Sequence, residues 1–145
     1  MDTVAPPHLV PTLLGDTITE FVVQDVHTFT LDSGGHITSG GLWRLLLNGQ
    51  IAATEMDYEQ TDWRTEAPPM KTQVEAKVLA HVIGKPVVGA RVTVPTGDLI
   101  IDFPDGATLE FIKLHSFLES WQVSARGLHL LVDAWGQVNQ WDGAA

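Results

Sequence analysis

Turn-forming residues interrupt this chain so often that they restrict it to short elements. Thirteen glycines and eight prolines are spread over 145 residues, and few stretches run beyond eight residues without a turn signal. Frequent short runs between turns favour strands, because helices need roughly ten or more uninterrupted residues. The sequence therefore predicts an α+β fold made mainly of antiparallel meanders. A chain of this length fits a single domain over residues 1–145.

One clear helix is expected near residues 70–83. Apolar residues recur there every four positions, at Met70, Val74, Val78 and Val82. That spacing places them on one face of a helix. Gly84 suits a left-handed C-terminal cap.

Period-two patterns follow the helix in short runs between turns. These runs cover residues 87–94, 99–103, 109–114, 121–125, 128–133 and 138–141. Short turns join antiparallel neighbours, so the stretch from 87 to 114 is predicted to form a meander.

The two halves of the chain align as an internal repeat over residues 8–60 and 77–133. Residues 27–34 lie over 99–106, and Trp43 lies over Trp121 with a glycine six residues after each. This alignment predicts a duplicated helix-plus-meander unit whose copies share one core. Two β-rich stretches with glycine turns can also align by coincidence, so the residues leave both interpretations open.

Charge and composition exclude several classes of function. Eighteen acidic residues against eight basic ones give a formal charge of −10, which disfavours nucleic acid and anionic membranes as partners. The chain has no cysteine and therefore no disulfide or thiolate nucleophile. Its first residues lack the pattern of a secretory signal and its apolar runs are short, so a cytoplasmic location is expected.

No recognised catalytic or cofactor-binding motif occurs in the sequence. The six histidines are scattered, with no pair at ligand spacing, so we expect no catalytic residue, no metal and no cofactor. Asp98 and Asp105 flank the run at 99–103 and Asp102 lies within it, and turn and surface roles explain all three best. A hydrolase built on Asp102 with Glu110 or Glu119 is the least favoured hypothesis.

An acidic segment is the most unusual local pattern. Glu55, Asp57 and Glu59 alternate along the chain, and Asp62 and Trp63 follow. On a strand the first three would project from one face. Such a row either protects a solvated sheet edge or forms a docking surface for a basic partner.

Five tryptophans supply the remaining candidates. Trp43 and Trp121 are predicted to be core anchors because of their matching places in the repeat. Trp135 and Trp141 flank the last predicted hairpin, where they could line an apolar groove between the two halves.

Three short motifs stand out in the second half: Gly-Asp-Leu at 97–99, Phe-Pro-Asp-Gly at 103–106 and Glu-Ser-Trp-Gln at 119–122. With these motifs the second half resembles a family of small bacterial proteins of unknown function. Similar small acidic proteins occur among immunity proteins that neutralise toxins. The resemblance implies a fold and no functional residues.

These observations favour a non-enzymatic protein-binding module, of the immunity type, with an acidic recognition surface for a basic protein. Its predicted site contains Glu55, Asp57, Glu59, Asp62 and Trp63. The alternative is a small-ligand-binding protein with Trp135 and Trp141 at its groove. A homodimer is compatible with either hypothesis.

Overall fold

A computed structural model describes residues 7–40, 42–59, 70–94, 96–113, 121–132 and 138–142. The protein has an α+β fold with two mostly antiparallel sheets and one main helix, as the sequence predicted. The first sheet has the order β1 (His8–Leu9), β7 (Gly89–Val92), β8 (Leu99–Asp102), β9 (Ala107–Ile112), β5 (Leu42–Leu47) and β6 (Gln50–Thr54). The second has the order β12 (Val138–Asp142), β11 (Leu128–Val132), β10 (Trp121–Ala125), β4 (His36–Ser39), β3 (His27–Leu31) and β2 (Ile18–Val23).

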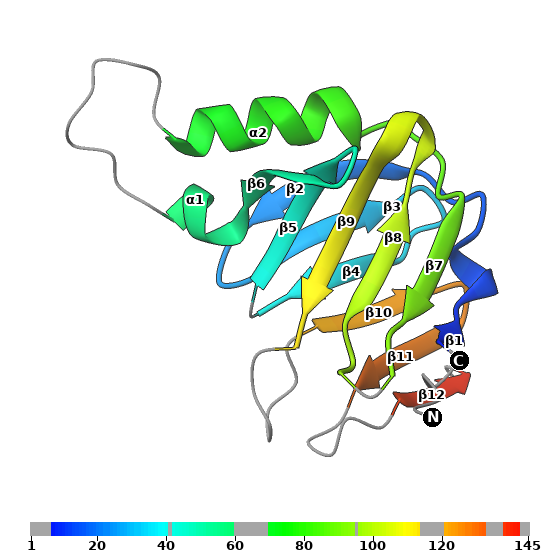
Figure 1. Ribbon diagram of the computed structural model, residues 1–145. Helices are drawn as coiled ribbons and strands as arrows, with labels where there is room; N and C mark the ends of the chain where they lie inside the picture. The colour runs from blue at the N-terminus through cyan, green and yellow to red at the C-terminus, as the bar shows by residue number, and fades with distance from the viewer. Residues whose placement is uncertain are drawn as a thin grey trace, which may run out of the picture.

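The two sheets pack face to face, and their strands cross steeply (Figure 1). One contiguous apolar core lies between them and receives buried side chains from both sheets, including Phe29, Trp43, Phe111 and Trp121. Both tryptophans are therefore the core anchors that the sequence predicted. Short 3-10 turns, η1 (Pro11–Leu13) and η2 (Pro104–Gly106), precede β2 and β9.

The main helix, α2 (Met70–His81), lies where the four-residue spacing predicted it. Val74 and Val78 are buried against the sandwich. Gly84 has a φ of 80°, the left-handed conformation expected after a helix end. The helix runs along one end of the sandwich beside β2 (Figure 1).

The meander β7-β8-β9 forms as predicted. After β9 the chain crosses to the other sheet, where β10 pairs with β4, while β9 itself pairs with β5. The first sheet thus combines the meander β7-β8-β9 with the hairpin β5-β6 and the short strand β1 from the first half of the chain. The second sheet combines the meander β2-β3-β4 with β10, β11 and β12 from the second half.

Five strands of each sheet correspond between the two halves: β2, β3 and β4 to β7, β8 and β9, and β10 and β11 to β5 and β6. With this correspondence, the order β2-β3-β4-β10-β11 in the second sheet matches the order β7-β8-β9-β5-β6 in the first. Residue registers correspond as well. Trp43 pairs with Phe111 in the first sheet, and Trp121 pairs with Ser39 in the second. The duplication of the sequence stays a prediction, but the corresponding positions allow the two halves to be compared residue by residue.

Candidate functional site

The acidic segment forms a single helical turn, α1 (Glu55–Glu59), and the prediction of a strand there is wrong. Thr54 and Asp57 explain the difference because they cap this turn reciprocally. The Asp57 N–H donates to the Thr54 hydroxyl (3.0 Å), and the Thr54 N–H donates to the Asp57 carboxylate (3.1 Å). This exchange is the capping box that starts many helices. Asp57 is therefore occupied by the cap and does not belong to a row of three free acids.

Helical spacing turns Glu55 and Glu59 toward the same side, because residues four apart share a helix face. Glu55 accepts a hydrogen bond from the Ser39 hydroxyl (2.7 Å). Glu59 lies 2.7 Å from Nε2 of His27 and keeps 61% of its side chain exposed. The two glutamates therefore attach α1 to β4 and β3, respectively.

His27 is buried at 3% exposure, and both of its ring nitrogens have a partner. The Trp43 indole N–H donates to Nδ1 (3.0 Å), so Nδ1 must carry a lone pair. Nε2 then carries the proton and donates it to Glu59. These contacts assign the neutral Nε2–H tautomer, since a proton on Nδ1 would face the indole N–H.

Burial raises the pKa of the Glu55 carboxyl above its ordinary value of 4.5, and the hydrogen bond from Ser39 opposes this shift. The direction follows from desolvation, which disfavours the charged form. Ser39 is itself fully buried, so the Ser39–Glu55 hydrogen bond is shielded from water on the Ser39 side.

Three aromatic rings lie around His27, those of Phe21, Trp43 and Tyr58. The Tyr58 ring lies edge-on to the His27 ring, with centroids 5.0 Å apart. Phe21 contacts both Trp43 (5.5 Å) and Tyr58 (5.8 Å) through edge contacts. Tertiary packing therefore connects the polar cluster of His27, Ser39, Glu55 and Glu59 to Phe21 on β2.

The side chains of this polar cluster have partners within the fold. The Ser39 hydroxyl donates to Glu55 and not to His27. Ser39 and His27 are also both buried. The cluster is suited to holding α1 against the sheets.

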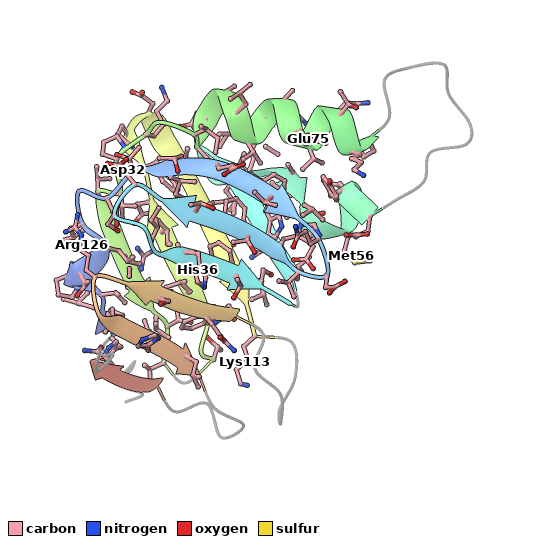
Figure 2. The ribbon with its side chains drawn as sticks, turned by 180° about the vertical axis from the view of Figure 1, so that it is seen from behind. Asp32, His36, Met56, Glu75, Lys113 and Arg126 are labelled. Atoms are coloured by element: carbon pink, nitrogen blue, oxygen red, sulfur yellow. The ribbon has the colours of Figure 1, made fainter. Side chains whose placement is uncertain are left out.

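Next to this polar cluster, a groove of about 440 Å³ separates α2 from β2. Figure 2 shows the helix running alongside the strand, with Glu75 on the helix. Phe21 belongs both to the groove and to the aromatic packing around His27. The residues that line the groove are Thr19, Glu20, Phe21, Thr72, Glu75, Ala76, Val78, Leu79 and Ile83.

The charge on the groove is negative. Glu20 and Glu75 both line it and are exposed, and no basic residue is among the described residues that line it. The two lysines of α2 make contacts elsewhere: Lys71 lies over the Tyr58 ring, and Lys77 donates to the Ala52 carbonyl (2.8 Å). Leu79 adds an apolar side chain that is 65% exposed.

Several predicted site residues are not among those that the structure describes. Asp62, Trp63 and Trp135 lie outside the described residues, as does the side chain of Trp141 in β12. The groove that the structure contains is lined by no tryptophan among the described residues. Partner binding by Glu55, Asp57 and Glu59 stays a prediction, now for side chains that also have contacts within the fold.

The two described carboxylates of the hydrolase hypothesis, Asp102 and Glu110, have structural partners. Asp102 pairs with Arg91 (2.7 Å) and accepts a hydrogen bond from Thr108, while Glu110 pairs with Arg44. Asp98 accepts a hydrogen bond from a backbone N–H (2.8 Å). Glu119 lies outside the described residues. Asp105 has a φ of 65° in a turn.

Sequence reasoning missed the polar cluster, although two signals for it were present. His27 alternates with Phe29 and Leu31, which places all three on the core face of one strand. The Thr54–Asp57 spacing matches a capping box at the start of the acidic segment. No sequence rule, however, brings His27 to Glu59 across 32 residues.

Within the described ranges, no three His, Asp or Glu side chains gather as metal ligands. None of the described helices is long and apolar enough to cross a membrane. Comparison with protein-family models, with curated proteins and with solved structures gives no significant match.

Proposed function

We propose that this protein is a protein-binding module that takes a basic, partly apolar segment of a partner into the groove between α2 and β2. The observation that carries the proposal is the composition of that groove: apolar walls, two exposed carboxylates and no lysine or arginine among its described lining residues. Its volume of about 440 Å³ lies within the usual range of binding pockets. The formal charge of −10 would further accelerate the approach of a basic partner.

Selection from a random peptide library, with the intact protein as bait, tests this proposal. We expect enriched peptides to combine Lys or Arg with aliphatic residues. Glu20→Lys and Glu75→Lys should each weaken binding of those peptides by about tenfold, since each brings a like charge toward the ligand. Asp32→Lys is the matched control, because it makes the same charge change at an exposed position outside the groove.

Enriched peptides that lack basic residues would contradict the proposal, as would equal losses in Asp32→Lys and the groove variants. Circular dichroism of each variant separates a loss of binding from a loss of folding.

A small apolar ligand is the second candidate for the same groove, because Phe21, Val78, Leu79 and Ile83 all line it. Phe21 lies 5.5 Å from Trp43, so an occupant that moves Phe21 would alter Trp43 fluorescence. A titration of apolar compounds that shifts this fluorescence in the wild type but not in Leu79→Lys would favour the second candidate.

A further inference from the structure

We infer that the partner segment binds as an extended strand that pairs with the open edge of β2 and places alternate side chains in the groove. This inference rests on the proposed function and specifies how the partner is held. Strand addition to an exposed sheet edge is a common form of peptide recognition, in which main-chain hydrogen bonds supply affinity and pockets supply specificity.

The two sheets differ at their corresponding edges. In the first sheet, β7 is covered by the short strand β1, where His8 pairs with Val92 and Leu9 with Arg91. In the second sheet, β2 occupies the corresponding place, and no described strand pairs with its outer side. The protein therefore already contains an extended segment on one of two matching edges.

The register identifies which atoms of β2 are available. Phe21 pairs with Phe29, and Ala90 pairs with Ile101 at the corresponding place in the other sheet. The Ala90 carbonyl accepts a hydrogen bond from the Val10 N–H just after β1 (3.0 Å). Because Phe21 holds the position in β2 that Ala90 holds in β7, the Phe21 carbonyl points outward, away from β3.

Hydrogen bonds inside the second sheet agree with this orientation. The Leu31 N–H donates to a backbone carbonyl in the turn just before β4 (2.8 Å). The backbone groups of Leu31 therefore face β4 and not β2. Backbone groups alternate along a strand, so the residues of β3 that face β2 are those paired with Glu20 and Val22. Phe21 and Val23 are left with their N–H and C=O groups turned away from β3.

Only part of the β2 edge is available to a partner. The Gly84 N–H donates to the Ile18 carbonyl (2.8 Å) and closes the start of the strand. A register shift between Ile18 and Glu20 further interrupts that end. A partner strand would therefore pair along residues 21–23, with one end beside Glu20 in the groove.

Charge complementarity determines the chemistry of this segment. Glu20 and Glu75 line the groove, and Asp25 is exposed in the turn just after β2. Because side chains alternate between the two faces of a strand, the matching segment alternates Lys or Arg with Val, Ile or Leu.

A short peptide of alternating lysine and valine, capped at both ends, is the probe. With the intact protein we expect binding by calorimetry, together with slower hydrogen exchange of the Phe21 and Val23 amides. N-methylation of alternate residues along one edge of the peptide should weaken binding by about tenfold, because it removes the donors that face β2. The isomer methylated along the other edge should bind like the parent peptide.

Val23→Pro tests the same edge from the protein side, because proline lacks the outward N–H. We expect weaker binding of the peptide to Val23→Pro and unchanged binding to the matched control Val23→Ala, with both variants folded by circular dichroism. No binding of the lysine–valine peptide would overturn the inference, as would equal binding of both methylated isomers.

The two proposals fail separately. If library peptides bind and respond to Glu20→Lys while both methylated isomers bind equally, strand pairing is wrong and the binding groove stands. If groove charge reversals have no effect on any peptide, the proposed function itself is wrong.

Discussion

The two halves of this chain place corresponding strands in the same registers but fill them with different chemistry. His27 and Ser39 pair across β3 and β4, whereas Leu99 and Phe111 pair at the corresponding place across β8 and β9. All four residues are buried. The apolar pair shows that the sandwich accepts hydrophobic side chains at these positions. His27 and Ser39 instead make polar contacts to α1, and His27 also accepts the Trp43 indole N–H from the facing sheet.

The two tryptophans sharpen this comparison. Trp43 donates its indole N–H to His27 (3.0 Å), and Trp121 donates to the Gly97 carbonyl (2.8 Å). A buried indole N–H needs an acceptor in either half. The first half supplies a titratable side chain, and the second supplies a backbone group.

The largest expected effect comes from replacing Phe111 in the second half by serine, the residue that the first half has at the corresponding position, Ser39. Phe111→Ser should cost about 4 kcal/mol of unfolding free energy, because it removes a ring packed 5.5 Å from Phe29 and leaves a cavity. Urea denaturation measures the loss. Ser39→Ala, which removes one hydroxyl from the matching position, should cost much less. Equal losses would break the distinction between the two halves.

Removing the indole donor in the first half should have an intermediate effect. Trp43→Phe leaves Nδ1 of His27 buried without a partner, which should cost about 2 kcal/mol in addition to lost packing. Leucine is the residue that the second half has at the position of His27. In the His27→Leu variant, Trp43→Phe should therefore cost less unfolding free energy than in the wild type. A double-mutant cycle by urea denaturation measures this coupling. Additive costs would show that the hydrogen bond contributes nothing.

The cap of α1 should have a smaller effect. Thr54→Ala removes one member of the reciprocal cap and should destabilise the protein by about 1 kcal/mol. Thr54→Ser, which keeps the hydroxyl, should unfold like the wild type. A full loss in the serine variant would assign the effect to packing of the threonine methyl group.

The smallest expected effect is the pH dependence of Glu55. Its pKa is raised in the folded state, so the folded protein holds this proton after the unfolded chain has lost it. Stability from this group is therefore complete below pH 4.5 and falls as the pH rises through the folded pKa. Urea denaturation across this range should show the wild type losing stability relative to Glu55→Gln as the pH rises. A constant difference would contradict the raised pKa.

Local pattern was sufficient to predict much of the fold. The spacing of Val74 and Val78 identified α2, and period-two runs identified the strands from β7 to β11. It failed at Glu55, Asp57 and Glu59, where alternation suggested a strand. The hydrogen bonds between Thr54 and Asp57 stabilise a helical turn there, and helical spacing gave two of the acids internal partners.

The sequence by itself determined most of the local elements, the absence of cysteine chemistry and the negative charge, because these depend on composition and on neighbours a few residues apart. Tertiary structure decided that β9 and β10 belong to different sheets, that Glu59 meets His27, and that α2 leaves a groove beside β2. Those outcomes depend on how two sheets bury their apolar faces against each other. Contacts between distant residues follow from that packing and have no signal in the spacing of the chain.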